Sequence, residues 1–477
     1  MKTAGCLIAA LVAAPLWAAS LDDSARQLSR DILRELIEIN TTDSVGSTTT
    51  AAEAMRSRLL AAGFPAADMS VLGPNARKGN LVARLRAAGA GAGKPILIIG
   101  HLDVVEARRS DWTTDPFRLV EQDGFFYGRG TQDMKGSDAI LVTTLIRFWR
   151  EGYRPDRDII VALTADEEGG TSNGVDWLLR NHRDLIDAGF ALNPDSGGVT
   201  TLDGKALDVE VACAEKLYAD FELKATNPGG HSSLPVPDNA IYHVADALSR
   251  LERAAFPFEL NAVTRAYFAR LAEVESPQNA ADIRAMLAEP PGQAAIERLS
   301  RVPQFNALVR TTCVATRLEA GHANNALPQT ARAIVNCRIL PGHSAEEVRL
   351  DLERIVADPA VSVRHIGDLN GQVEDHAPAE KSPAPVVLRA DVMAPLERLA
   401  ARFWPGAPVV PDMETGASDS RFTNAAGIPT YGFSALAIDR DDVRAHGKDE
   451  RLRVDSYYDG VAFYYDYLKA LTGGAAK

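Results

Sequence analysis

The chain has 477 residues, of which 46% are hydrophobic and 24% are charged, and its formal net charge is -13. A chain of this length is too long to fold around one hydrophobic core of ordinary size. It therefore indicates a globular protein of two or three domains. The acidic balance excludes nucleic acid as a partner, because phosphate binding requires clustered Lys and Arg that this sequence lacks.

The N-terminus has the order of a secretory signal peptide. Lys2 is followed by an apolar run at residues 7–17 and by the small residues at 18–20. The run is too short to cross a bilayer as a helix. We therefore expect residues 1–20 to be removed, leaving a periplasmic or secreted protein without an integral membrane segment.

The first half of the mature chain alternates strands with helices. Helices are predicted at 28–36, 50–62, 137–151 and 175–181, and strands at 80–85, 95–100, 159–164 and 190–193. The last helix of the chain is predicted at 456–471. This alternation favours a mixed or parallel sheet covered by helices, an α/β fold.

The pattern changes near Glu215. Strands at 217–225, 311–318, 330–339 and 361–365 and helices at 239–254 and 344–357 follow, with a helical segment at about 257–308. Without that segment the order is β-α-β-β-α-β, which is typical of a ferredoxin-like domain. We therefore predict an α+β domain at 215–370, inserted into an α/β domain that comprises residues 21–214 and 371–477.

Three cysteines remain after signal removal, Cys213, Cys313 and Cys337. An odd number leaves at least one thiol unpaired within the chain. Buried structural thiols are favoured over a disulfide, because free Cys is among the most buried residue types. The sequence has no C-x-x-C spacing, which argues against a metal site built from cysteines.

Acidic residues follow the strand predicted at 159–164. Asp166, Glu167 and Glu168 come directly after this uncharged run. Ligands in open α/β sheets bind outside the carboxyl ends of the strands, so these carboxylates would occupy the usual position of an active site. A solvated acidic turn before Gly169 and Gly170 is the alternative interpretation.

Further metal-binding side chains stand at other strand ends and turns. They are His101 and Asp103, Asp133 in a Gly-rich turn, Asp195, and His446 near the C-terminus. A set of His and carboxylates without Cys favours a hydrolytic zinc site, or less specifically manganese or cobalt. Any one of these residues taken alone is more often structural, and it is their joint occurrence that indicates a site.

Six segments carry residues of this kind: H-L-D-V-V (101–105), G-R-G-T-Q-D-M-K-G (128–136), T-A-D-E-E-G-G (164–170), N-P-D-S-G-G (193–198), P-G-G-H-S-S (228–233) and H-G-K-D-E-R (446–451). Together they resemble the dinuclear zinc aminoacylase and carboxypeptidase family, which includes glutamate carboxypeptidase, succinyl-diaminopimelate desuccinylase, carnosinase and carboxypeptidase S. The resemblance covers essentially the whole mature chain, in the family's order. It implies a catalytic domain interrupted by a lid and dimerisation domain.

The resemblance also implies a division of roles around two divalent metal ions. Asp133 would bridge the two ions, His101 and Asp195 would complete one site, and Glu168 and His446 the other. In a site of this kind the two metal ions share a bridging hydroxide, which attacks the substrate. Glu167 would be the general base, and Asp103 would orient the imidazole of His101.

Residues of the lid and of the C-terminal part match positions that contact substrate in the resembling family. His231, commonly from a neighbouring subunit, would stabilise the oxyanion, and Asn325 and Arg338 would contact substrate. Arg421 would pair with the substrate carboxylate. Pro194 and Asp195 stand where many relatives have Glu, a change within the same ligand chemistry, and the segment at 257–308 would enlarge the lid.

The sequence therefore predicts an exported dinuclear metal hydrolase of amides or peptides that carry a free carboxylate. It would be a carboxypeptidase, a dipeptidase or an N-acyl-amino-acid amidohydrolase. One alternative is a homologue that binds metal or peptide without turnover, which would have no need of Glu167. Another is an aminopeptidase of related fold, which would need an acidic clamp in place of Arg421. Side-chain preference, native metal and oligomeric state stay open.

Overall fold

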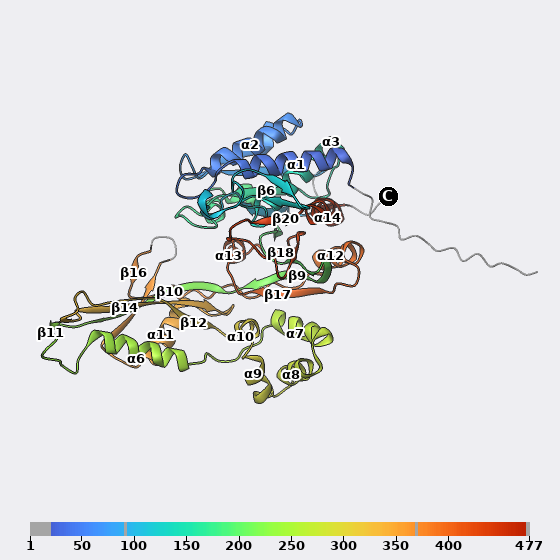
Figure 1. Cartoon of the computed structure of the whole chain (residues 1–477). Coiled ribbons are helices and arrows are strands. Elements are labelled where there is room, and N and C mark those ends of the chain that lie inside the picture. Colours follow the sequence, from blue (N-terminus) through green and yellow to red (C-terminus); the bar gives the residue numbers. More distant parts are fainter. Residues whose placement is uncertain (1–20, 90–92, 368–370, 474–477) are drawn as a thin grey trace, which may run out of the picture.

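The computed structural model describes residues 21–89, 93–367 and 371–473 (Figure 1). The predicted signal peptide, residues 1–20, lies outside the described residues. Within the described ranges, every helix is either too short or too polar to cross a membrane.

A large mixed sheet forms the centre of the described chain. Its ten strands are, in spatial order, β1 (Met69–Leu72), β2 (Asn80–Leu85), β6 (Ile159–Thr164), β3 (Ile96–His101), β7 (Phe190–Asn193), β18 (Thr430–Gly432), β9 (Lys205–Glu215), β8 (Gly198–Leu202) and β19 (Ala437–Asp439), with β17 (Val409–Glu414) paired to β9. All six residues of β6 are buried, as its uncharged sequence predicts. β6 is parallel to β3 and antiparallel to β2, so the sheet is mixed.

Helices cover both faces of this sheet, because the buried strands present apolar side chains on each side. Ile96 and Ile98 belong to one core and Leu97 and Ile99 to another. The first core includes helices α1 (Asp23–Glu38), α2 (Thr48–Ala61), α3 (Lys135–Arg150), α12 (Ala390–Phe403) and α14 (Val454–Thr472). The second includes α4 (Gly174–Asn181), α5 (Arg183–Ile186) and α13 (Ser420–Ala425). The predicted α/β fold is confirmed.

A small three-stranded sheet and two short 3₁₀ helices complete this part of the described chain. The sheet consists of β4 (Val120–Gln122), β5 (Phe125–Tyr127) and β20 (Arg451–Arg453), and the 3₁₀ helices are η1 (Ala66–Asp68) and η2 (Arg109–Asp111). Because β20 pairs with β5, the segment after His446 lies against the segment that leads to Asp133.

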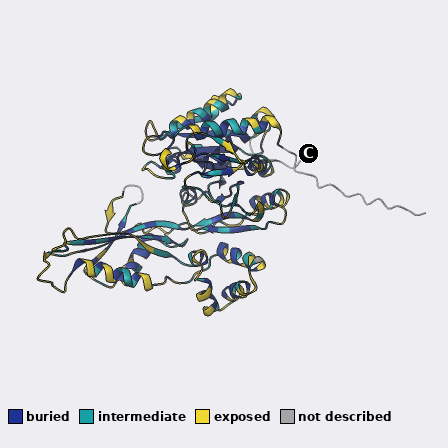
Figure 2. Cartoon of the chain, viewed as in Figure 1, coloured by how far each residue is buried: buried dark blue, intermediate teal, exposed yellow. Residues whose placement is uncertain are grey.

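The inserted segment forms a second sheet, here called the lid sheet. Its strands are, in spatial order, β12 (Thr312–Ala320), β14 (Thr330–Ile339), β10 (Leu217–Thr226), β15 (Val361–Ile366) and β16 (Val373–Glu374). Helices α6 (Ala240–Arg253) and α11 (Ala345–Val356) pack on one face of the sheet. The predicted β-α-β-β-α-β order is confirmed, whereas the boundaries at residues 215 and 370 stay a prediction. Buried residues lie along β10 and β14, whereas most of β12 is exposed, and the outer faces of the helices are exposed (Figure 2).

The helical segment differs from the prediction that it enlarges the lid. It contains α7 (Ala262–Val274), α8 (Pro277–Leu287), α9 (Gln293–Leu299) and α10 (Pro303–Leu308). Its buried residues, such as Phe268, join the core of the large sheet and are absent from the core under the lid sheet. The amide of Asn261, the N-cap of α7, contacts the sulfur of Met413 in β17 at 3.4 Å. These helices therefore lie beside β17 (Figure 1).

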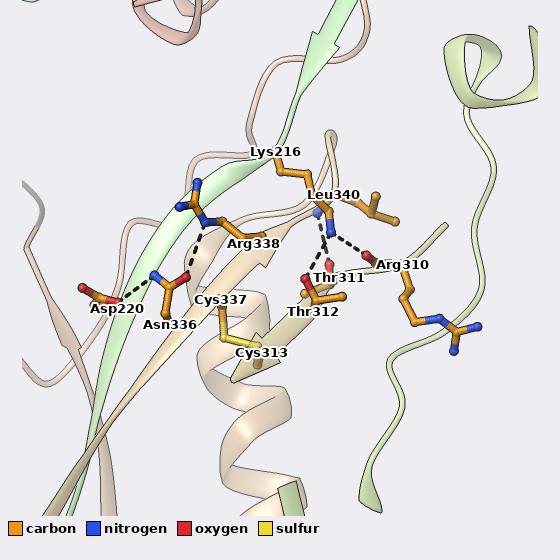
Figure 3. Close-up of a disulfide and its surroundings, with 10 residues drawn as sticks. All are labelled: Lys216, Asp220, Arg310, Thr311, Thr312, Cys313, Asn336, Cys337, Arg338 and Leu340. Atoms are coloured by element: carbon orange, nitrogen blue, oxygen red, sulfur yellow. Dashed lines mark hydrogen bonds between the residues drawn. A yellow bond between two sulfur atoms is a disulfide. The ribbon is translucent and has the colours of Figure 1, made fainter. Parts of the chain in front are cut away.

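The expectation of three buried thiols is wrong for two of the cysteines. Cys313 and Cys337 form a disulfide, because they are directly opposed on the antiparallel strands β12 and β14, with Cα atoms 4.1 Å apart (Figure 3). This strand register could not be deduced from the sequence. Cys213 is a free, buried thiol, as expected.

Candidate metal centre

Three of the predicted metal ligands meet at the carboxyl ends of neighbouring strands. His101 is the last residue of β3, Asp195 follows β7, and Asp133 lies in the loop before α3. Nε2 of His101 is 3.0 Å from Oδ1 of Asp133 and 3.3 Å from Oδ1 of Asp195. The sheet thus assembles this group at the edge where ligands of α/β proteins bind.

Glu168 and His446 complete the cluster from the other side of Asp133. Nε2 of His446 is 2.9 Å from the Glu168 carboxylate and 3.0 Å from Oδ2 of Asp133. The two carboxylate oxygens of Asp133 therefore face different imidazoles. All five side chains predicted to bind metal are brought together.

The geometry of the cluster fits divalent cations. One ligand atom from each of His101, Glu167 and Asp195 lie within 4.8 Å of one another, and so do those of His101, Asp133 and Glu168. A nitrogen and an oxygen that bind one tetrahedral ion at about 2.0 Å are about 3.3 Å apart, close to the spacings observed. Glu167 lies near enough to be a ligand itself, so distance alone does not separate a base from a ligand.

The main chain fixes the tautomer of His101. Its Nδ1 lies 3.0 Å from the backbone carbonyl of Asp103, which can only accept, so Nδ1 carries the proton and donates it. Nε2 is then the ring nitrogen that faces the cluster, and it is the atom that would bind a metal ion.

The carboxylate of Asp103 acts on a different group. It lies 3.9 Å from the ring nitrogen of His101 and accepts hydrogen bonds from the backbone N–H groups of Glu167, at 3.2 Å, and Glu168, at 2.9 Å. Burial raises the pKa of Asp103 to about 7. Asp103 therefore contacts the ring through its main chain and holds the acidic turn through its side chain.

The cluster is crowded with buried acidic groups. Burial raises the pKa of Glu167 well above its ordinary value, and the charge of Asp195 adds to this; burial also raises the pKa of Glu168. Burial would raise the pKa of Asp133 too, but hydrogen bonds with His101 and His446 hold it well below its usual range. Bound divalent cations would relieve this crowding, because a metal is the largest local charge in such a site.

Glu450 supports the loop that carries Asp133 and was not identified from the sequence. Its fully buried carboxylate accepts hydrogen bonds from Nη1 of Arg129 at 2.7 Å and from the backbone N–H groups of Gly130, Gln132 and Asp133, the last at 3.2 Å. Arg129 and Glu450 both lie within the motif segments 128–136 and 446–451, so the sequence marked each of them as a candidate. It did not show that the two side chains pair with each other.

A second supporting network connects Asp195 to the start of the lid, and it was also missed. The N–H of Asp195 donates to the amide oxygen of Asn193 at 3.1 Å, and the amide nitrogen of Asn193 donates to Oγ of Ser418 at 3.1 Å. The N–H and hydroxyl of Ser418 both donate to Glu215 at 2.9 Å. Glu215 is the last residue of β9 before the chain enters the lid sheet.

A cleft of about 550 Å³ lies between the cluster and the lid sheet. Glu167, Glu168 and His446 line one side, and Arg338 of β14 and Arg421 of α13 also line it. Nε of Arg338 donates to the side chain of Asn336 at 3.4 Å (Figure 3). Two predicted substrate residues therefore share a cleft with the acidic turn.

His231 and Asn325 lie together, but away from this cleft. His231 is in the short strand β11 (Gly230–His231), which pairs with β13 (Ala326–Leu327), and the N–H of Ser232 donates to the carbonyl of Asn325 at 3.1 Å. Both residues are exposed, and β11 lies at the end of the lid remote from the large sheet (Figure 1). Neither residue lines the 550 Å³ cleft of the same chain.

Comparisons with known proteins place this site among hydrolases. The sequence model of the family described as "Peptidase family M20/M25/M40" matches residues 97–470. The chain is 31% identical over 387 residues to the probable carboxypeptidase S-like 2 of Dictyostelium discoideum, covering 79% of this chain and 71% of that protein. It is 30% identical to the human N-fatty-acyl-amino acid synthase/hydrolase PM20D1, covering 79% and 74% respectively.

Solved structures share the fold. A metallo-carboxypeptidase of the M20 family from Sulfolobus solfataricus superposes with a TM-score of 0.69 at 17% identity, covering 94% of this chain and 99% of that one. Human carnosine dipeptidase 1 gives 0.59 at 14% identity, covering 94% and 97%. At these identities the similarity concerns the fold, a catalytic domain with an inserted lid domain.

Proposed function

The chain belongs to peptidase family M20/M25/M40, and we propose that it is an exported, dinuclear metal-dependent hydrolase of amide or peptide bonds beside a free carboxylate. Zinc is the proposed metal, with manganese or cobalt as alternatives. The observation that carries the proposal is the carboxylate of Asp133, which contacts His101 with one oxygen and His446 with the other.

Five side chains would hold the two ions. Asp133 would be shared, His101 and Asp195 would bind one ion, and Glu168 and His446 the other. When bound, two metal ions at such a site lower the pKa of a water molecule and polarise the carbonyl group of the substrate. The carbonyl of Asp103 and the carboxylate of Glu450 position His101 and the Asp133 loop for this task.

Glu167 would move the proton. It follows β6 beside Glu168, within 4.8 Å of ligand atoms of His101 and Asp195, so it reaches the space where water and substrate would meet. A carboxylate that is not engaged by metal can take a proton from the attacking water and return it to the leaving amine. Asp103 fixes the turn that aims it.

Arg421 and Arg338 would bind the free carboxylate of the substrate in the cleft. A guanidinium suits this task because it pairs with a carboxylate through two parallel hydrogen bonds. The names of the two sequence relatives, a carboxypeptidase and an N-fatty-acyl-amino acid hydrolase, describe substrates in which an amino acid is held by an amide bond.

His231 and Asn325 would act across a homodimer formed by the lid. Both are exposed at the far end of the lid, so a second copy could bring them to a site that they do not reach in their own chain. Mixing inactive His231→Ala with inactive Glu167→Gln protein tests this. Activity regained in the mixture is expected, because one site of each mixed dimer would be intact; no recovery in a confirmed mixed dimer would contradict it.

Hydrolysis before and after chelation tests the proposed activity. We expect the metal-loaded protein to cleave dipeptides or N-acyl amino acids, to lose this activity on chelation, and to cleave the corresponding C-terminal amides poorly. Binding of metal and ligand without turnover would instead favour a non-catalytic homologue. Cleavage that needs a free amine and ignores the carboxylate would favour an aminopeptidase. Export would be checked by an N-terminus near residue 21 in secreted protein.

A further inference from the structure

A second cavity reaches the metal-ligand cluster away from the lid cleft. It has a volume of about 300 Å³ and is lined by Asp133 and Asp195. The lid cleft is lined by Glu167, Glu168 and His446, and the two cavities share no lining residue. The cluster therefore separates two spaces, each in contact with different ligands.

Apolar side chains form much of the wall of this second cavity. Val199 of β8 and Ile438 of β19 come from neighbouring parallel strands, and Leu436 and Val443 flank β19 on either side in sequence. Val199 and Leu436 are buried, whereas Val443 is 66% exposed and stands at the mouth. The wall thus runs from the buried cluster to solvent.

Most polar groups of the wall already have partners within the protein. The side chain of Gln132 donates to the carbonyls of Asp442 and Arg451 and accepts from the N–H groups of Arg444 and Ala445. Oγ of Ser434 accepts from the N–H of Leu436, and Arg440 pairs with Asp441. The side chains of Gln132 and Ser434 are therefore engaged within the protein and would not need a polar ligand, whereas Arg440 is 58% exposed and lies on the solvent side of the wall.

Glu210 is an acidic residue of this wall that lies outside the metal-ligand cluster. Burial, with the charges of Asp412, Asp208 and Glu414 adding, raises the pKa of Glu210 to about 8. The group is therefore mainly uncharged at neutral pH and compatible with an apolar neighbour. A second carboxylate on the ligand would be disfavoured here.

The geometry of an amide assigns the two cavities to the two halves of a substrate. An amide is planar, and its two substituents leave the bond in opposite directions when it is trans. Arg421 and Arg338 line the lid cleft and suit the carboxylate of the amino-acid half. With the carbonyl at the cluster, the acyl half then points away from the lid cleft.

We propose that the cavity beside Asp133 and Asp195 is the acyl subsite and that it takes an uncharged, apolar acyl chain. This assignment rests on the proposed hydrolase function and deepens it. It places N-acyl amino acids with an apolar chain ahead of dipeptides with a free amine as substrates.

The test uses the full-length mature protein, loaded with zinc, and one amino acid carrying acetyl, hexanoyl or dodecanoyl chains. We expect kcat/KM to rise with chain length until the cavity is filled, since each buried methylene contributes up to about fourfold. Val443→Glu should lower kcat/KM for the dodecanoyl substrate at least about tenfold more than for the acetyl substrate. Val387→Glu, at a site 78% exposed and outside the cavity, is the matched control and should change neither.

Four outcomes would overturn the proposal, and they separate failure of the subsite from failure of the proposed function. Hydrolysis of the acetyl substrate with no dependence on chain length, or an equal effect of Val443→Glu on all chains, would refute the acyl subsite while leaving the hydrolase function intact. A clear preference for dipeptides with a free amine over their acylated counterparts would do the same. No hydrolysis of any member by the metal-loaded protein would refute the proposed function, and the subsite with it.

Discussion

The ammonium group of Lys78 contacts the buried carboxylate of Asp166, the first of the three consecutive acidic residues after β6. Lys78 also lies 2.6 Å from Asp43, and the second oxygen of Asp166 accepts a hydrogen bond from the N–H of Ser172 at 3.1 Å. Asp166 has a φ of 58°, which few residues other than Gly adopt. It therefore shapes the turn that presents Glu167 and Glu168.

Lys78→Met should destabilise the protein through this pair. The change leaves the carboxylate of Asp166 buried without its cation, which costs roughly 3 kcal/mol of unfolding free energy. Lys94→Met is the matched control, because Lys94 and Asp187 form an exposed pair worth about 1 kcal/mol or less. The midpoints of denaturant unfolding would measure both. Equal shifts would contradict a structural role for the buried pair.

Glu167→Gln and Glu168→Gln should separate the base from the ligand. We expect Glu167→Gln to lower kcat about 100-fold or more while the protein keeps both metal ions, because a general base contributes about that much. Glu168→Gln should lose metal. Elemental analysis beside steady-state kinetics measures both. Loss of metal from Glu167→Gln would place Glu167 among the ligands, which its position near His101 and Asp195 allows.

Both metal ions should depend on Asp133, and their removal should destabilise the protein. The proposed site predicts two ions per chain and an unfolding free energy that rises with free metal, by about 2.7 kcal/mol for each site at a free metal concentration of about 100 times Kd. Asp133→Asn should lower the affinity for both metal ions together, whereas Asp195→Asn should lower the affinity for one of them. Metal titration followed by calorimetry distinguishes these patterns. Independent loss of a single ion from Asp133→Asn would argue against a bridging role.

The disulfide between Cys313 and Cys337 should stabilise the lid. Its sequence separation of 24 residues corresponds to about 3.5 kcal/mol in the chain-entropy model. The double variant Cys313→Ser/Cys337→Ser should therefore unfold at a lower temperature than the wild type. Reductant should lower the wild-type midpoint to that of the variant and leave the variant unchanged. A variant as stable as the oxidised wild type would contradict this.

Acid should destabilise the lid through Glu346. Hydrogen bonds from Arg349 lower the pKa of Glu346 from its ordinary 4.5 to about 2. A carboxylate with a lowered folded-state pKa stabilises the fold fully above its unfolded pKa and progressively less as pH falls toward the folded value. Between pH 5 and 3, Glu346→Gln should thus lose less stability than the wild type. The exposed Glu380→Gln is the control and should follow the wild type; identical pH profiles for all three would contradict the prediction.

The sequence predicted those parts of the site that local signals encode. A buried strand followed by polar residues at its carboxyl end identifies His101, Glu168 and Asp195, because strand ends of one sheet converge. The α/β fold and the inserted β-α-β-β-α-β domain followed from element order alone.

Features that depend on pairing between distant segments could not be predicted in this way. β18 has only three residues, so no periodicity marks it, yet it lies between β7 and β9. The disulfide depends on the register of β12 and β14, and the position of the helical segment depends on its contact with β17. Asp103 contacts His101 through a backbone atom, which side-chain chemistry does not reveal.

The place of β18 in the large sheet sets an order for assembly on the ribosome. A nascent chain that ends before residue 430 lacks the strand that joins β7 to β9, and it also lacks His446. Domains generally fold as units during synthesis, but this one cannot close until the whole insert and β18 have been made. The hydrolytic centre would therefore come into existence only after His446 has left the ribosome.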